Sequence, residues 1–170
     1  EALFHSLTGS LGPLPIVAED LGTITSDVEH LRQSFAFPGM RVLQFAWVGD
    51  IDNPHLPHNH SRDAVVYTGT HDNDTTIGWW AGLDDATRRH VCEYLGIDGH
   101  EIHWDLIRGA CASVADTAIL PLQDVLGLDG RHRMNTPGQT AGCWTWRVHR
   151  SSLSDGPAER LAALCHLHQE

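Results

Sequence analysis

The chain contains no lysine, and positive charge is scarce throughout it. Its 11 basic residues are all arginines and stand against 22 acidic residues, which gives a formal net charge of −11. A chain with this balance repels phosphate backbones, so we expect no nucleic-acid partner. No apolar run approaches the ~20 residues that cross a bilayer, so we also expect no membrane partner.

Cysteine is scarce as well, and the four cysteines are far apart. Their spacing matches neither a CxxC metal knuckle nor a small disulfide scaffold, so we predict free thiols and a reducing, cytoplasmic compartment. The chain starts at Glu1 without an initiator methionine or a charged-then-apolar leader. We therefore expect no secretion signal and a chain that begins partway through a longer protein.

A glycine-rich phosphate turn is also missing. The first predicted strand, residues 14–20, is followed by "EDLGTIT", which holds one glycine. A dinucleotide-binding turn needs several glycines so that the backbone can approach the phosphates. This argues against a nucleotide, and we expect no cofactor.

Apolar runs and helical patterns alternate along the chain, which is typical of parallel α/β construction. The predicted strands lie in four apolar runs: residues 14–20, 40–47, 64–69 and the start of 117–128. The predicted helices are residues 25–35, with a capping box of Ser26 and Glu29; 85–96, between Asp84 and Gly96; 101–116; and 157–168. This order suits either an open doubly wound sheet or part of a (β/α)8 barrel.

Polar residues follow the predicted strands, where parallel sheets gather their chemistry. They are Glu19 and Asp20, Gln44 and Trp47, His71 and Asp72, and Gln123 and Asp124. Aspartate often forms turns there, but glutamate favours neither turns nor strands, so Glu19 requires a partner or a function. Glu19, His71 and Asp72 could cleave a glycosidic bond, which needs a proton donor and negative charge beside an oxocarbenium-like transition state.

Two other interpretations of these residues remain open. A divalent-metal site could use the histidines of "NPHLPHNH" with the polar residues downstream: His55, His58, His60, His71, Asp72 and Asp74. A carbohydrate-binding module without catalysis could stack sugars on tryptophans near the polar ends, for which Trp47, Trp79 and Trp80 are candidates. Trp104 lies on an apolar helical stripe and is predicted to be core.

Seven strings, in this order along the chain, carry a family resemblance: "LPIVAEDLGTIT", "FPGMRVLQFAW", "NPHLPHNH", "VVYTGTHDNDTTIGWW", "PLQDVLGL", "RMNTPG" and "CWTWR". Together they closely resemble the C-terminal part of the 4-α-glucanotransferases known as amylomaltases or disproportionating enzymes, a glycoside hydrolase family of the α-amylase clan. The resemblance implies that residues 1–170 form the C-terminal half, strands 5–8, of a catalytic (β/α)8 barrel, with no complete second domain.

The resemblance also implies an activity, the transfer of α-1,4-glucan segments between maltodextrins by a retaining double displacement. Glu19 of "AEDLG" falls on the general acid/base, and Asp72 of "THDND" falls on the transition-state stabiliser. His71 and Asn135 match residues that contact substrate. Two further substrate-binding candidates, Trp47 and Asp74, adjoin the same strand ends. No metal is implied.

Two departures from the family pattern limit what the chain can do. The nucleophilic aspartate of the family lies in an Arg-x-Asp-His string upstream of the matched segment, and the chain contains no such string. We therefore expect that the N-terminal part of the same enzyme completes the barrel, and that these 170 residues turn nothing over alone. The family usually has Gly-Asn-Trp where this chain has Cys143 in the middle position.

Because Glu19 emerges from an apolar strand, we expect its side chain to be desolvated.

Overall fold

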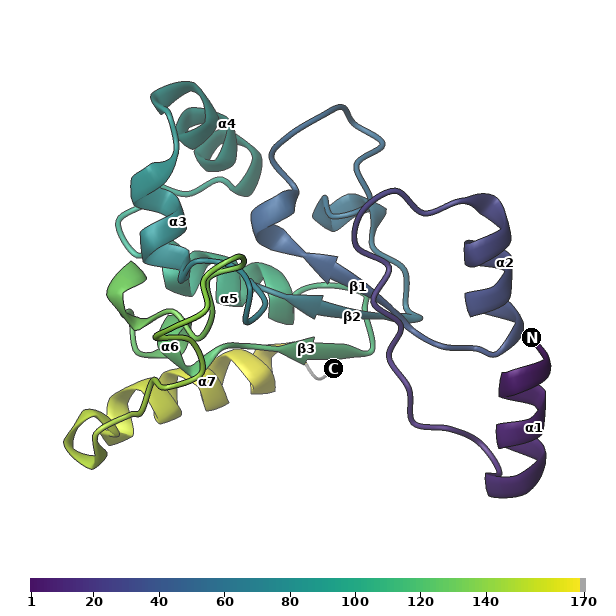
Figure 1. The fold of residues 1–170 in the computed structure, drawn as a ribbon. Helices are drawn as coiled ribbons and strands as arrows, with labels where there is room; N and C mark the ends of the chain where they lie inside the picture. The colour runs from purple at the N-terminus through teal and green to yellow at the C-terminus, as the bar shows by residue number, and fades with distance from the viewer. Residues whose placement is uncertain (169–170) are drawn as a thin grey trace.

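The computed structural model describes residues 1–168, so the last two positions of the expected 1–170 domain lie outside it (Figure 1). Its centre is a three-stranded parallel sheet in the order β1-β2-β3, formed by Gly39–Val42, Ala64–Tyr67 and Thr117–Ile119. Val42 pairs with Tyr67, and Tyr67 pairs with Ile119. The carboxyl ends of the three strands are therefore level at one edge of the sheet, and the prediction of an α/β fold with parallel strands and helices is confirmed.

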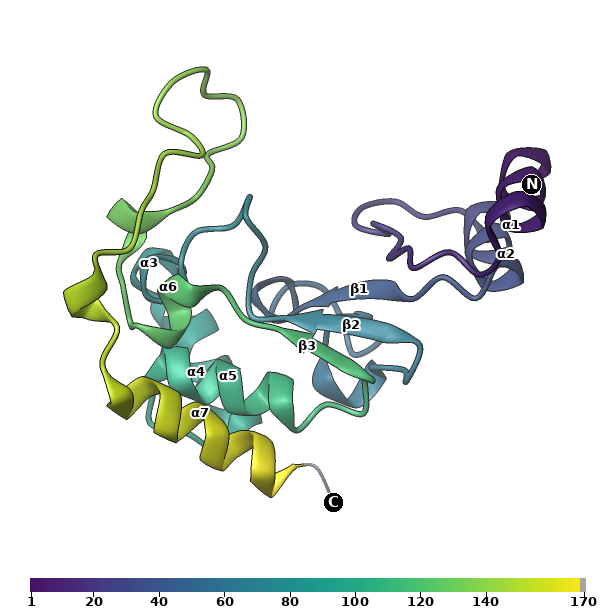
Figure 2. The ribbon, with the colours of Figure 1, turned by 90° about the horizontal axis from the view of Figure 1, so that it is seen from below.

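Helices α4, α5 and α7 cover one side of the sheet, whereas α1 and α2 lie apart from it (Figure 2). The α-helices are α1 (Ala2–Leu11), α2 (Ser26–Ser34), α3 (Thr76–Gly82), α4 (Asp85–Leu95), α5 (Ile102–Cys111), α6 (Leu122–Val125) and α7 (Asp155–Leu167). Short 3-10 helices are η1 (Leu43–Phe45), η2 (Pro57–Asn59), η3 (Gly130–His132) and η4 (Arg150–Ser152). Figure 2 shows α4, α5 and α7 below the sheet, while the loop between α6 and α7 rises on the other side. None of the helices within residues 1–168 is long and apolar enough to cross a membrane.

Two apolar clusters join the helices to the sheet. One of them centres on buried side chains of β2, α4 and α5, among them Val66, Val91 and Leu106. The other seats α7 on α5 around Trp104 and Ile107, which confirms Trp104 as core. These clusters pack helices against one face of the sheet. The carboxyl ends of the strands stay free of this packing and can carry a site.

The helix boundaries predicted from the sequence are confirmed for α4 but differ from the structure in other helices. The boundaries of α4 are confirmed: the Asp84 side chain accepts a hydrogen bond from the Thr87 amide, and Gly96 adopts φ 65°. The capping box of α2 is wrong, because the helix starts at Ser26 itself and Glu29 instead binds Arg32 at 2.7 Å. Helix α5 ends at Cys111, five residues before the predicted end, and the final helix starts earlier than predicted, at Asp155.

The first predicted strand, residues 14–20, does not join the sheet. Its backbone makes one bond toward β1, from the Ala18 amide to the Pro38 carbonyl at 2.9 Å. Beyond it, the Asp20 carboxylate accepts the Met40 amide hydrogen at 2.6 Å, where a strand carbonyl would serve in a ladder. The segment is thus extended beside β1 but lacks the regular backbone pairing of a strand. The second predicted strand is shorter than expected, because it turns into η1 after Val42.

The histidine-rich loop is structural. The Val42 amide donates to Nδ1 of His55 at 3.1 Å, and the His60 ring lies 3.0 Å from the His55 carbonyl. The His58 ring contacts the Tyr94 hydroxyl at 2.7 Å. Over residues 1–168, no group of His, Cys, Asp and Glu side chains is arranged to hold a metal ion. These histidines hold the loop against β1 and α4 and do not converge with Asp72.

We expect His55 to make the fold acid-sensitive. Burial, together with nearby Arg41, lowers the pKa of His55 to about 4. A depressed pKa means that the folded state favours the neutral ring. The contribution of His55 to the free energy of unfolding is therefore fully present above the ordinary pKa near 6.5, and it is lost as the pH falls toward 4. Urea unfolding should therefore show a loss of up to about 3 kcal/mol over that range. His55→Asn, whose amide oxygen can accept from Val42 without titrating, should flatten the dependence.

A matched control is His58→Asn, which changes an exposed histidine of the same loop. It should keep the wild-type pH dependence of the free energy of unfolding. If wild type and His55→Asn lose stability in parallel on acidification, another group is responsible.

Candidate active site

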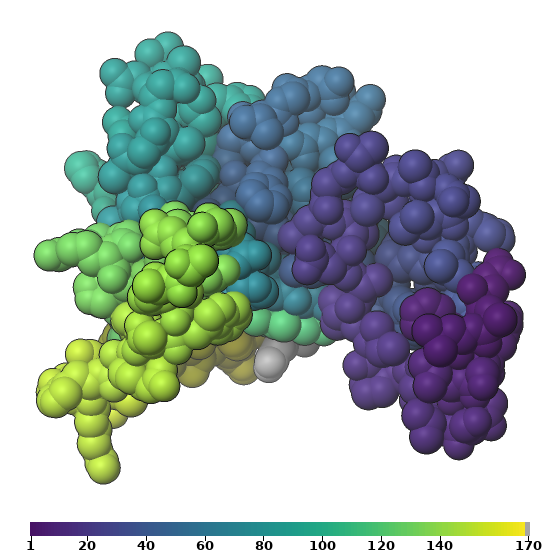
Figure 3. All heavy atoms as spheres, viewed as in Figure 1, coloured from purple at the N-terminus to yellow at the C-terminus, as the bar shows by residue number. Residues whose placement is uncertain are grey.

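A cavity of about 880 Å³ opens at the carboxyl edge of the sheet. Figure 3 shows the hollow between the yellow-green loop after α6 and the purple N-terminal segment. Its polar lining residues include Glu19, Tyr67, Thr70, His71, Asp72, Asn73, Asp74, Gln123, Asp124 and Arg133, and its aromatic ones include Phe45, Trp144 and Trp146. Five segments that are far apart in sequence therefore meet at the place where the strand order predicts chemistry.

The turn after β2 is held together by its threonine and asparagine. The amide and hydroxyl of Thr70 both donate to the Asn73 side-chain oxygen, at 2.9 and 2.8 Å. The Asp72 amide donates back to the Thr70 hydroxyl at 3.3 Å. Because these residues satisfy the turn, the side chains of His71 and Asp72 are not needed for it and lie exposed at the cavity.

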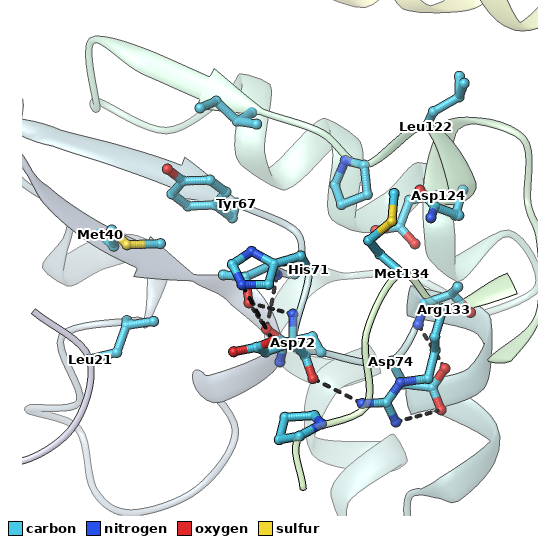
Figure 4. Close-up of a pocket in the computed structure, with 18 of the residues that line it drawn as sticks. Leu21, Met40, Tyr67, His71, Asp72, Asp74, Leu122, Asp124, Arg133 and Met134 are labelled. Atoms are coloured by element: carbon cyan, nitrogen blue, oxygen red, sulfur yellow. Dashed lines mark hydrogen bonds and ion pairs between the residues drawn. The ribbon is translucent and has the colours of Figure 1, made fainter. Parts of the chain in front are cut away.

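Asp72 lies at the centre of a small polar cluster (Figure 4). The Asn135 amide donates to its Oδ1 at 2.5 Å, and Nε2 of His71 lies 3.3 Å from the same oxygen. The Asp72 side chain is half exposed. One carboxylate oxygen is thus fixed by protein donors, and the carboxylate as a whole still faces the cavity.

Asp74 is enclosed more tightly than Asp72. Its backbone carbonyl accepts a hydrogen bond from the side-chain amide of buried Gln44 at 2.9 Å, and its carboxylate lies 3.8 Å from Arg133. A Cβ on either Gly78 or Gly130 would overlap this carboxylate, so both glycines are required for the close approach. Asp74 lines the cavity and also fixes the end of the turn.

Asp124 forms the floor beneath the turn. It is 1% exposed and accepts from the Thr68 hydroxyl at 2.6 Å, the Thr76 amide at 2.7 Å and the Thr76 hydroxyl at 2.9 Å. Burial raises the pKa of Asp124, and the hydrogen bonds from Thr68 and Thr76 oppose that rise. Thr68 and Thr76 flank the turn, so this carboxylate joins its two ends and is committed to structure.

Glu19 and Asp20 point in different directions. Glu19 lines the cavity, whereas the Asp20 side chain turns to β1, where it accepts from the Met40 amide at 2.6 Å and the Arg41 guanidinium at 3.1 Å. The expected desolvation of Glu19 is wrong for this structure, because its side chain is exposed. Within residues 1–168 the segment's backbone bond to another segment is toward β1, and no strand pairs with its other side.

The predicted role of Trp47 conflicts with its position. The indole is 7% exposed and packs against Tyr94 of α4 at 5.5 Å between ring centroids. It does not line the cavity, because η1 turns the chain toward the helical side directly after β1. Trp79 and Trp80 also pack on the core. The site residues that meet at the cavity are Glu19, His71, Asp72 and Asp74, joined by Asn135 through its bond to Asp72.

Trp144 and Arg133 line the cavity but were not predicted as site residues. Trp144 is 56% exposed and has φ 62°, and its ring lies against the His71 ring, tilted by 42° with 4.9 Å between ring centroids. A left-handed backbone is costly for a tryptophan and is typical of sites where the side chain must be placed in one direction. Arg133 reaches the turn from the same loop. The two tryptophans of "CWTW" are a sequence signal that could have pointed to Trp144, but nothing local to Arg133 distinguishes it from other loop arginines.

The sequence has relatives that support the resemblance. A family model described as 4-alpha-glucanotransferase, Glyco_hydro_77, matches residues 1–153. The 4-alpha-glucanotransferase of Synechocystis is 53% identical over 168 residues, which are 97% of this chain and 33% of that protein. The chloroplastic/amyloplastic 4-alpha-glucanotransferase DPE1 of Arabidopsis thaliana is 48% identical over 99% of this chain and 30% of its own length. The plastid location in that name gives no support to a cytoplasmic location here.

Solved structures agree with the sequence relatives. The amylomaltase of Streptococcus agalactiae, in complex with acarbose, superposes with a TM-score of 0.93 at 30% identity, over 99% of this chain and 34% of that one. The amylomaltase of Corynebacterium glutamicum, at 18% identity and a TM-score of 0.64, supports the fold alone. The chain spans about a third of the length of these proteins. Because the family model covers most of its residues, the chain belongs to the Glyco_hydro_77 family of 4-alpha-glucanotransferases.

Proposed function

We propose that the chain supplies the C-terminal half, strands 5–8, of the (β/α)8 barrel of a 4-alpha-glucanotransferase. In this proposal residues 14–20 become strand 5 when a neighbouring strand pairs with their open side, and β1, β2 and β3 are strands 6, 7 and 8. The level carboxyl ends of these strands and the backbone match to the Streptococcus agalactiae enzyme support this assignment. The N-terminal part of the same enzyme would close the barrel.

The proposed reaction is transfer of α-1,4-glucan segments between maltodextrins with retention. A carboxylate attacks the anomeric carbon while Glu19 protonates the departing glycosidic oxygen. Glu19 then removes a proton from the 4-hydroxyl of a second maltodextrin, which attacks the glucosyl-enzyme and restores the nucleophile. Asp72 stabilises the positive charge that develops on the sugar ring in both steps.

The nucleophile is proposed to come from the N-terminal part of the enzyme. Three other carboxylates of this chain lie at or beside the cavity, and each has another use. Asp20 holds Met40 and Arg41, and Asp124 is buried on threonines. Asp74 accepts from the Thr75 amide and lies 3.8 Å from Arg133. His71, Asp74 and Asn135 are proposed substrate contacts, and Trp144 offers an aromatic face to a sugar.

One observation carries the proposal. Glu19 and Asp72, which lie 53 positions apart, line the same cavity at the carboxyl edge of the sheet. Its volume of about 880 Å³ falls within the ~300–1,000 Å³ of small-molecule sites. A proton donor and a negative charge that face one cavity are the two groups that this proposal requires of the second half of the barrel.

The test is a chimaera in which this chain replaces the matching third of the Synechocystis relative. With maltotriose as the sole substrate, we expect glucose and maltodextrins longer than maltotriose, detected by chromatography. The isolated chain under the same conditions should release no glucose. A folded chimaera that binds acarbose but leaves maltotriose unchanged would contradict the proposed transfer and leave glucan binding without catalysis.

A further inference from the structure

Arg133 joins the loop after η3 to the turn after β2. Its Nη2 donates to the Asp72 carbonyl at 2.9 Å, and its Nε donates to the Asn135 carbonyl at 3.2 Å. Its Nη1 lies 3.8 Å from the Asp74 carboxylate. The side chain is 25% exposed, so one guanidinium contacts three residues that line or adjoin the cavity from a largely enclosed position (Figure 4).

These contacts act on Asp72 from two sides. The bond to its carbonyl fixes the backbone from which the carboxylate projects. The bond to the Asn135 carbonyl fixes the residue whose amide donates to Oδ1 of Asp72 at 2.5 Å. Arg133 thus holds both the carboxylate's own backbone and its hydrogen-bond donor, although it makes no contact with the carboxylate itself.

We infer that Arg133 is a positioning residue that sets the orientation of the Asp72 carboxylate by joining the 70–75 turn to the 133–147 loop. This inference rests on the proposed function, in which Asp72 stabilises the transition state. The planar fork of an arginine suits the role, because it donates in several fixed directions at once. A lysine ammonium carries the same charge but lacks this fixed fork.

Arg133→Ala in the chimaera tests the role. Misplacement of a catalytic group by about 1 Å can cost ~10²-fold in rate, so we expect kcat for maltotriose to fall by about 10²-fold with a much smaller change in KM. Guanidinium chloride at millimolar concentration should restore part of kcat by occupying the vacated space. Arg133→Lys should remain impaired. A wild-type kcat in Arg133→Ala, or full activity in Arg133→Lys, would overturn the inference.

The matched control is Arg147→Gln. Arg147 is exposed on the same loop and donates to the carbonyl of its neighbour Trp146 at 2.8 Å. Its removal should leave kcat, KM and the response to guanidinium unchanged. An equal loss in both variants would mean that general loosening of the loop, and not the contacts of Arg133, lowers the rate.

Hydrogen exchange of the isolated chain separates this inference from the proposed function. In Arg133→Ala, amide exchange should accelerate in residues 70–75 and 134–146 while α5 stays protected. An inactive wild-type chimaera would count against glucan transfer, and exchange would then decide the role of Arg133. Unchanged exchange in both segments would overturn it.

Discussion

Glu19→Gln in the chimaera is expected to abolish disproportionation of maltotriose, with kcat lowered by about 10²–10⁴-fold. Glutamine has nearly the same shape but can neither protonate the departing oxygen nor accept the acceptor's proton. Glu19 lines the cavity, whereas its neighbour Asp20 holds β1, so no adjacent carboxylate can take over. The measurement is the initial rate of glucose release.

A fluoride leaving group separates this role from a simple loss of binding. Fluoride departs without protonation, so α-maltosyl fluoride should glycosylate the Glu19→Gln variant much faster than maltotriose does. Glu93→Gln, an exposed change on α4 outside the cavity lining, should behave as wild type with both substrates. Equal impairment of Glu19→Gln on the two substrates would remove Glu19 from the acid role.

The local rules predicted those parts of the fold whose causes are local. The boundaries of α4 follow from Asp84 and Gly96, which act within a few residues of themselves. The same local rules predicted a strand at residues 14–20, and this prediction is wrong. An apolar run indicates a strand, but a strand ladder also needs a partner with free backbone groups. Here the neighbouring residues are Pro38, which has no amide hydrogen, and Met40, whose amide donates to the Asp20 side chain. The outcome depends on tertiary neighbours that the run does not encode.

The site shows the same division. That Glu19 and Asp72 meet at the cavity was predictable, because each lies at the end of a predicted strand and parallel strands bring their ends together. Trp47 was expected at the same strand ends but lies in the core, since the strand ends at Val42 and turns into η1, which no local signal predicted. The bonds of Arg133 and Asn135 to Asp72 span 61 and 63 positions. Contacts of that range arise from the path of the whole loop, which spacing alone does not predict.

Asp72→Asn is the second change with a large expected effect, a loss of about 10²–10³-fold in kcat. The amide fits the same space but removes the negative charge that faces the developing oxocarbenium ion. It also brings an uncharged group against the Asn135 amide and His71, both of which lie within 3.3 Å of Oδ1. The binding of acarbose should weaken less than kcat falls, because much of the cavity wall is unchanged.

The two fluoride experiments distinguish the roles of the carboxylates. The transition state carries positive charge on the sugar ring whichever group leaves, so Asp72→Asn should be impaired with α-maltosyl fluoride as well as with maltotriose. Asp85→Asn, whose side chain is 91% exposed on α4, is the matched control and should retain wild-type rates. If the fluoride rescued Asp72→Asn as it should rescue Glu19→Gln, Asp72 would act in proton transfer. The assignment of acid and stabiliser across this cavity would then have to be reversed.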